Sequence, residues 1–267
     1  MSDYSVEIQN LSFSYIKNRD VLSKISISVK KGETIALLGR NGCGKSTLIK
    51  CIMNFLKPHN GTILIDGRNS TSYSVREFAR RVAYVSQNYF GNEDCNLKDF
   101  LLLGRSPFIS AFAMPKKEDH EIVNEYAAQC QITKLLDTPI KHLSGGQRQI
   151  AVIARALIQQ SDIIIMDEPS AALDLSNQVL LLNMMRKVIS LGKTVLYSTH
   201  DPNHALVLGS TVCLLHNGAV YDYGHADSVI TQQSITEIYG RGILVEKLNE
   251  STYCRFSIDQ SSIQTNK

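Results

Sequence analysis

The feature that most limits how this chain can fold is the glycine-rich segment GRNGCGKST, residues 39–47. It follows the apolar run ETIALLG and leads into LIKCIMNFL, so we expect a buried strand before it and a helix after it. The segment fits G-x-x-x-x-G-K-[ST], in which backbone N–H groups surround phosphates and Lys45 reaches the β- and γ-phosphates. The Ser46 hydroxyl suits Mg²⁺, and the helix adds the positive end of its dipole. A glycine turn with an incidental lysine is the alternative, and the flanking strand and helix argue against it.

Runs typical of strands and helices alternate along the rest of the chain. RVAYVSQ, DIIIMDEP and KTVLYSTH are typical of buried strands, and helical patterns separate them, which predicts a mostly parallel sheet with right-handed crossovers. Ile25, Ile27 and Val29 alternate with polar residues, which indicates antiparallel strands of an N-terminal side sheet. The Asn-Gly pair in TVCLLHNGAVYDYG predicts a hairpin. The mainly helical stretch of residues 92–157 interrupts the alternation and is interpreted as an inserted subdomain.

Composition excludes several classes of function. The chain has 267 residues, 43% of them hydrophobic and 20% charged, which fits a globular protein with one large domain or two modest ones. A net charge of +3 does not provide the strongly basic face that nucleic acid requires, so no nucleic-acid partner is expected. Six scattered cysteines without a CxxC pair favour free thiols in a reducing compartment. There is no signal-peptide pattern and no run long enough to span a bilayer, so work at a membrane would need spans from another chain.

Two carboxylates follow the apolar run IIIM. Asp167 and Glu168 are expected at the carboxyl end of a buried strand, the edge where open α/β sheets bind ligands. Asp167 suits direct or indirect Mg²⁺ coordination, and Glu168 suits polarising the water that attacks a γ-phosphate. A helix cap is the alternative role for these acidic residues.

A second glycine-rich loop, HLSGGQRQ, precedes apolar residues spaced i, i+3, i+4, i+7 and i+8 from Ile150, the pattern of an amphipathic helix. This loop has no lysine of the kind found at position 45. Ser144 and the two glycines after it can present a hydroxyl group, backbone N–H groups and a helix N-terminus to a phosphate. The pattern therefore indicates a second phosphate-type loop without a lysine of its own.

Together these segments resemble the ATP-binding subunits of ABC transporters. GRNGCGKST, the SQ pair ending at Gln87, LSGGQ, IIIMDEP, AALD and STH occur in that order and at typical spacing over nearly the whole chain. The resemblance implies an α/β fold: a P-loop NTPase core with a mostly parallel sheet, an N-terminal antiparallel β side sheet and an inserted α-helical subdomain. It also implies a single ATPase domain over residues 1–255 and a polar C-terminal tail over residues 256–267.

The resemblance also implies roles for individual residues, with ATP and Mg²⁺ as ligands. Gln87 would sense Mg²⁺ and the attacking water, His200 would contact the γ-phosphate, and these two would act with Glu168 as the catalytic residues. Tyr15 would stack on adenine, unless it is an ordinary tyrosine at the rim of its strand. The expected Mg²⁺ contacts are Ser46, Gln87 and Asp167. The expected nucleotide contacts are Tyr15, Gly39, Arg40, Asn41, Gly42, Cys43, Gly44, Lys45, Ser46, Thr47, Ser144, Gly145, Gly146, Gln147 and Asp174.

The second loop lies in the insert, beyond Gln87 from Lys45, so we expect it to complete the nucleotide site of a second copy. Asp174 would end the loop that communicates across that dimer. This chain has Ala171 where the family commonly has serine or threonine, and the missing hydroxyl would weaken one cross-dimer hydrogen bond, worth about 0.5–1.5 kcal/mol. It also has Ser170 where threonine is common. Cys43 is interpreted as a small filler, with a redox-sensitive thiol as the alternative.

Four phrases narrow the subtype. LLLGRSPF, ALDLSNQ, THDPNHA and SVITQQSITEIYG resemble bacterial importers of iron-siderophores, haem and cobalamin, and related importers of molybdate. The resemblance implies a homodimer of ATPase subunits at the cytoplasmic face of the cell membrane, with two transmembrane permease subunits and a periplasmic or surface substrate-binding protein. An iron chelate is the favoured cargo because such systems are common.

Two other classes remain as alternatives. A soluble, non-transport ABC ATPase would usually carry two cassettes or a long inserted coiled coil, and an exporter ATPase would lack the importer-like phrases. For an importer, we expect a helix of the permease to enter a groove on the insert. Leu101, Leu102, Phe108 and Phe112 either line that groove or pack the insert's own core.

Overall fold

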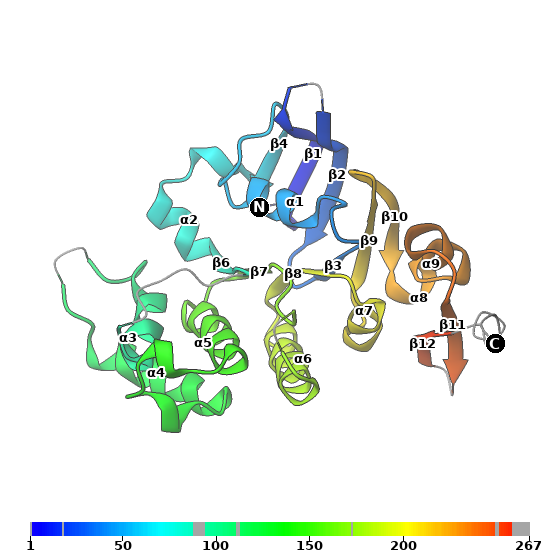
Figure 1. Ribbon diagram of the computed structural model, residues 1–267. Coiled ribbons are helices and arrows are strands. Elements are labelled where there is room, and N and C mark those ends of the chain that lie inside the picture. Colours follow the sequence, from blue (N-terminus) through cyan, green and yellow to red (C-terminus); the bar gives the residue numbers. More distant parts are fainter. Residues whose placement is uncertain are drawn as a thin grey trace.

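The computed structural model describes residues 2–17, 19–87, 94–110, 113–171, 173–248 and 251–257. Its centre is a six-stranded sheet in the order β10-β9-β3-β8-β7-β6 (Figure 1). Neighbouring strands from β9 to β6 pair in parallel, and β10 pairs with β9 antiparallel. This confirms the predicted α/β fold with a mostly parallel sheet and the predicted hairpin. The strands are β3 (Thr34–Leu38), β6 (Val82–Val85), β7 (Ile163–Met166), β8 (Thr194–Thr199), β9 (Thr211–His216) and β10 (Ala219–His225).

A four-stranded antiparallel sheet lies beside the central sheet, in the order β2-β1-β4-β5. The alternation of Ile25, Ile27 and Val29 places these side chains in the core and their polar neighbours in solvent, as the pattern predicts. The apolar run GTILIDG also joins this sheet, so the side sheet is built from both sides of the phosphate loop. Its strands are β1 (Tyr4–Ile16), β2 (Arg19–Lys30), β4 (Asn60–Ile65) and β5 (Arg68–Asn69).

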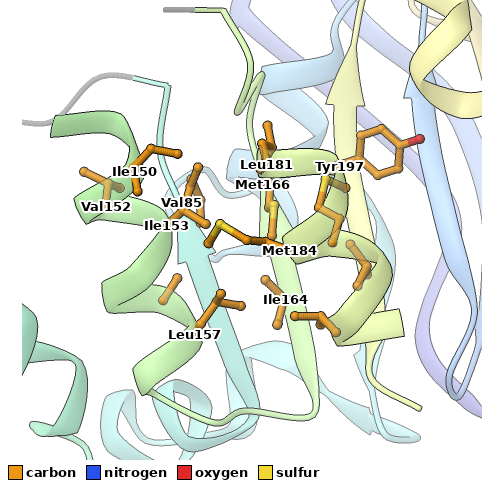
Figure 2. Packing of buried hydrophobic residues seen from close by; sticks show 14 of the residues in the cluster. Val85, Ile150, Val152, Ile153, Leu157, Ile164, Met166, Leu181, Met184 and Tyr197 are labelled. Atoms are coloured by element: carbon orange, nitrogen blue, oxygen red, sulfur yellow. The ribbon is translucent and has the colours of Figure 1, made fainter. Parts of the chain in front are cut away.

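The central sheet separates two apolar cores, and alternate residues of one strand serve each. Ile35 and Leu37 of β3 pack with the side sheet and the helix after the phosphate loop. Ala36 and Leu38 belong to the core on the opposite face, which Figure 2 shows at Ile164 and Met166 of β7. A strand buried on both faces has to be mainly apolar, which explains the run IALL after Thr34. The helices outside the insert are α1 (Lys45–Ile52), α2 (Val75–Arg81), α6 (Leu175–Ser190), α7 (Pro202–Leu208), α8 (Ala226–Val229) and α9 (Gln232–Tyr239).

Between β6 and β7 the chain leaves the sheet and forms a helical region beside it (Figure 1). Leu101 and Leu102 are buried in its core, so they pack the insert and do not line a groove. Phe108 is 40% exposed, and Phe112 lies outside the described residues. The helices here are α3 (Leu97–Leu102), α4 (Lys117–Gln129) and α5 (Gly145–Ile158). Short 3₁₀ turns occupy Leu103–Arg105, Thr133–Leu135 and Ile140–His142, and another precedes α2 at Ser70–Ser72.

A C-terminal hairpin of β11 (Ile243–Leu248) and β12 (Ser251–Phe256) was not predicted. It is held against α7 by a pair of hydrogen bonds: the Asn203 side chain donates to the carbonyl of Cys254 at 3.1 Å and accepts from the Cys254 N–H at 2.8 Å. β12 thus includes Phe256, the first residue of the expected tail, and residues 258–267 lie outside the described part. Among the helices that the structure describes, none has the length and apolar character needed to cross a membrane.

Candidate nucleotide-binding and hydrolysis site

The phosphate loop, residues 39–47, joins the carboxyl end of β3 to the N-terminus of α1. Gly44 adopts a left-handed conformation with φ 108°, and a Cβ atom there would lie 2.7 Å from Leu22 Cδ2. Only glycine combines that backbone with that approach. Lys45 is 4% exposed, and its Nζ donates to the carbonyl oxygens of Gly39 at 2.8 Å and Arg40 at 3.2 Å. The loop therefore folds around the ammonium group of its own lysine.

Asp167 lies at the end of β7 and is almost completely buried. Its Oδ1 accepts from the hydroxyls of Ser46 at 2.9 Å and Ser198 at 2.7 Å. Ser198 Oγ in turn accepts the backbone N–H of Glu168 at 2.8 Å. Ser198 thus orients both acidic residues from the neighbouring strand β8. Sequence reasoning missed it, although it stands two residues before His200 in the STH segment.

Glu168 is the point at which the predicted catalytic residues meet. Its Oε1 lies 3.5 Å from Lys45 Nζ, and its Oε2 lies 3.5 Å from Gln87 Nε2 and 3.7 Å from His200 Nδ1. The backbone of Glu168 has φ 43°, a strained value for a residue with a side chain. The Ser198 bond to its N–H holds that conformation. Three segments far apart in sequence therefore converge on one carboxylate.

A cavity of about 260 Å³ opens in front of these groups. Lys45, Ser46, Gln87 and Glu168 line it together with Val21, Asn41, Gly42, Gly44 and Thr47. The backbone amides and the ammonium group suit the phosphates of a nucleotide. Ser46 and Asp167 offer Mg²⁺ two adjacent oxygens, and the described residues contain no cluster of three His, Cys, Asp or Glu side chains around a metal position. That donor set fits Mg²⁺, which in nucleotide sites takes one or two carboxylates and completes its shell with phosphate oxygens and water.

Tyr15 and Cys43 are two further residues for which the sequence suggested alternative roles. The Tyr15 ring is 58% exposed, packs edge-on against Phe13 at 4.9 Å, and its hydroxyl lies 3.3 Å from Thr47 Oγ1. An exposed aromatic side chain thus contacts Thr47, one of the residues that line the phosphate cavity. Cys43 is buried, and burial raises the pKa of its thiol even though Lys45 opposes the shift. A protonated, enclosed thiol supports the filler interpretation over a redox-sensitive one.

The signature loop, residues 143–147, has a different environment. Ser144 caps α5: its hydroxyl accepts the Gln147 N–H at 3.2 Å, and Gln147 Oε1 accepts the Ser144 N–H at 3.0 Å. A Cβ on Gly145 would meet no atom within 4 Å, whereas one on Gly146 would lie 3.1 Å from Asn177 Nδ2 of α6. None of Ser144–Gln147 is among the residues that line the cavity around Lys45.

Asp174 begins α6 as its N-cap and accepts hydrogen bonds from the Asn177 N–H at 2.8 Å and the Ser176 hydroxyl at 2.9 Å. These hydrogen bonds lower the pKa of the Asp174 carboxyl group, and the bond from the backbone N–H of Asn177 has the largest effect. Gln149, which the sequence did not single out, is buried and donates to the carbonyl of Pro169 at 3.1 Å. It ties the helix of the signature loop to the turn that follows Glu168.

Known proteins with the same features identify the family. A family model described as "ABC transporter" matches residues 22–171. The chain belongs to the ABC transporter family. It is 34% identical over 221 residues to the ferric enterobactin transport ATP-binding protein FepC of Escherichia coli, a match that covers 82% of each protein. It is 30% identical over 236 residues to the molybdate import ATP-binding protein MolC of Haemophilus influenzae, with 88% of each covered.

Its fold is likewise that of a solved metal-chelate type ABC transporter in an inward-facing conformation, with a TM-score of 0.81 and 28% identity, covering 98% of this chain and 100% of the other. This ABC protein is therefore an ATP-binding ATPase of the importer type, and the resemblance to iron-siderophore systems is confirmed. The structure gathers the phosphate loop, Gln87, Asp167, Glu168 and His200 at one edge of the ABC ATPase. It leaves the signature loop outside that group.

Proposed function

We propose that this chain is the ATPase subunit of an importer that takes up an iron chelate of siderophore type through a separate membrane permease. ATP hydrolysis is supported by the positions of Lys45, Gln87 and His200, whose side chains all lie close to the carboxylate of Glu168. The cargo is supported by the similarity to the enterobactin protein FepC and by the phrases of the sequence that resemble such importers. Molybdate is the second candidate cargo, because the similarity to MolC is nearly as extensive.

In the proposed mechanism the phosphate loop binds the triphosphate and Tyr15 stacks on adenine. Ser46, Asp167 and Gln87 would hold Mg²⁺, which neutralises charge on the phosphates. Lys45 Nζ lies 3.5 Å from Glu168 Oε1, so the two side chains form an ion pair. Phosphates entering the cavity compete for that ammonium group. We infer that ATP draws Lys45 away from Glu168 and so leaves the carboxylate to accept a proton from water.

Gln87 and His200 then have distinct positions around the same carboxylate. Gln87 follows β6 and His200 follows β8, so they approach Glu168 Oε2 from the two strands on either side of β7. In this proposal Gln87 orients the attacking water, and His200 contacts the γ-phosphate. Both side chains are exposed, which allows each to respond to the nucleotide.

We further propose that two copies of this single ATPase domain close on two ATP molecules. Ser144 and Gly145 are exposed, and the signature loop does not line the cavity of its own chain. The Ser144 hydroxyl and the N–H groups of Gly145 and Gly146 can therefore meet a γ-phosphate held by a second copy. Asp174 lies next to the signature loop, because Gly146 packs on Asn177 of the helix that Asp174 caps. Signature loop and Asp174 would thus enter the dimer interface together.

The remaining partners in this proposal are two transmembrane permease subunits, and a periplasmic or surface substrate-binding protein that delivers the cargo. The ATPase would sit on the cytoplasmic face of a bacterial cell membrane. Leu103, Phe108 and Met114 expose apolar side chains on the insert and are our proposed contacts for the permease.

Reconstitution tests this function. The chain, its permease and the binding protein are assembled in liposomes, and ATP hydrolysis is measured with a ferric siderophore, haem, cobalamin or molybdate presented by the binding protein. We expect a ferric siderophore to stimulate hydrolysis severalfold and to accumulate inside the vesicles. Stimulation by molybdate alone would move the proposal to the second candidate, and the absence of stimulation by every cargo would contradict the importer proposal.

A further inference from the structure

The phrase LLLGRSPF has a structural role at the C-terminal end of the signature-loop helix. Gly104 is buried in the turn after α3, and a Cβ atom there would lie 2.4 Å from the carbonyl oxygen of Arg155 and 3.1 Å from Ile158 Cγ2. Any side chain at Gly104 would push this turn off the last turn of α5. The turn and the helix are therefore in direct backbone contact.

Arg105 continues that contact with its side chain. Its Nη1 donates to the carbonyl of Ile158, the last residue of α5, at 3.2 Å and to Gln160 Oε1 at 3.1 Å. Its Nε donates to Asp119 Oδ1 of α4 at 2.9 Å. A guanidinium group at a helix C-terminus satisfies a carbonyl that has no partner within the helix and opposes the negative end of its dipole. Arg105 therefore fastens α5 to α4 and to its own turn.

The same turn is also held by the ATPase core. Arg76 and Arg80 of α2 each donate from Nε to the carbonyl of Pro107 at 2.9 Å, and Arg76 donates from Nη2 to that of Ile109 at 2.8 Å. In Figure 1, α2 lies on the side of the core that faces the insert. Phe108 lies between these anchors: the guanidinium carbon of Arg105 is 4.4 Å from its ring centre and that of Arg80 is 5.7 Å away.

We propose that Gly104 and Arg105 form a joint through which a displacement of residues 103–109 is passed along α5 to the signature loop. Arg105 is thus a positioning residue for Ser144. The helix has 14 residues, so it spans about 21 Å from the joint to the loop. Its apolar face is packed against β6, β7 and α6 by Ile153 and Leu157 among others (Figure 2), which makes it move as a unit. Leu103 and Phe108, exposed at the joint, are proposed permease contacts, so this part rests on the proposed function.

Hydrogen–deuterium exchange on the isolated full chain tests the joint without a permease. In Arg105→Gln we expect amide exchange of residues 155–160 and 103–109 to rise about tenfold, because charge-assisted hydrogen bonds are lost. Asp119→Asn is the matched control: it weakens the ion pair with Arg105 but leaves the contacts of Arg105 with α5, so exchange at residues 155–160 stays near that of the parent. Unchanged exchange at residues 155–160 in Arg105→Gln would overturn the joint.

ATP-driven dimerisation tests the positioning role. In a Glu168→Gln background, where slow hydrolysis preserves the ATP complex, Arg105→Gln should leave ATP binding to the monomer unchanged and weaken dimerisation about tenfold. Arg105→Lys, which keeps the charge, should recover part of the loss. Normal dimerisation of Arg105→Gln would overturn the positioning role. If the background protein itself does not dimerise with ATP, the two-copy arrangement of the proposed function is wrong, and the exchange experiment still decides the joint.

Discussion

The phosphate loop and the signature loop are both glycine-rich turns at the N-terminus of a helix, yet their surroundings in the structure differ. The phosphate loop is folded around Lys45, and its helix is connected through Ser46 to Asp167. In the signature loop Ser144, Gly145 and Gln147 are exposed, and Ser144 makes its hydrogen bonds to its own helix. One loop belongs to an assembled site, whereas the other presents donors to something outside the described chain.

Because of this difference, the two loops contribute different free energies to phosphate binding. Hydrogen bonds from a charged group contribute about 1.5–3 kcal/mol each, whereas the field of a helix N-terminus contributes about 0.3–1 kcal/mol at a surface. The signature loop alone is therefore too weak to capture a nucleotide. It suffices to favour a phosphate that Lys45 of another copy has already bound. A lysine in both loops would allow each to bind ATP separately and would remove the dependence of closure on the shared nucleotide.

The largest effect is expected from removing the carboxylate on which the first site depends. Glu168→Gln should lower the hydrolysis rate by about 10²–10⁴, because a general base is lost, while ATP still binds. The amide keeps the shape and the Ser198 bond to the backbone. Single-turnover hydrolysis and equilibrium ATP binding are measured side by side. Glu121→Gln, on the exposed face of α4, is the control, and a Glu168→Gln rate near that of the control would exclude Glu168 as the base.

The second largest effect is expected on ATP affinity, when the lysine of the phosphate loop is removed. Lys45→Ala should weaken ATP binding roughly a hundredfold, because two charge-assisted contacts of about 1.5 kcal/mol each are lost. Lys50→Ala removes an exposed lysine from the same helix and should bind ATP normally. Titration calorimetry with both variants measures the difference. Equal affinities would mean that the ammonium group of Lys45 serves Glu168 and not the nucleotide.

Much of the first loop's surroundings could be predicted from the sequence because the signals are local. The strand before Gly39, the helix after it and the carboxylates after β7 each follow from short runs of residues. Ser198 could not be predicted in the same way, because its role arises from the pairing of β8 with β7. The membership of β4 in the side sheet has the same cause: a short apolar strand does not reveal which sheet will accept it.

Residues of the insert show more clearly why long-range packing could not be predicted from the sequence. A pair of leucines such as Leu101 and Leu102 can line a groove or fill a core, and the sequence does not distinguish the two. Their burial follows from the core that they form with residues of α5. Gly104 and Arg105 belong to a recognisable phrase, but their contacts with Arg155 and Ile158 connect residues about fifty positions apart. The C-terminal hairpin is similar, since its attachment to Asn203 is long-range.

The smallest of the three effects tests the second loop alone. Ser144→Arg and Ser144→Asp should each leave ATP binding to the monomer unchanged and weaken ATP-driven dimerisation about 10- to 100-fold. Arginine fills the space before the helix, whereas aspartate adds a negative charge where the γ-phosphate of the second copy would lie. Aspartate remains a good N-cap, so its effect is not explained by loss of the cap. Ser190→Arg, at the exposed end of α6, is the control for added size and charge.

Dimerisation of these variants is measured by light scattering in the Glu168→Gln background, with and without ATP. If Ser144→Asp dimerises on ATP as well as the Ser190→Arg control, no γ-phosphate meets the signature loop, and the contrast between the two loops has another cause. If it fails to dimerise while its ATP affinity is unchanged, the weaker loop is the one that makes closure depend on ATP. The two loops then have separate roles: Lys45 determines the affinity of the monomer for ATP, and Ser144 determines whether bound ATP leads to dimerisation.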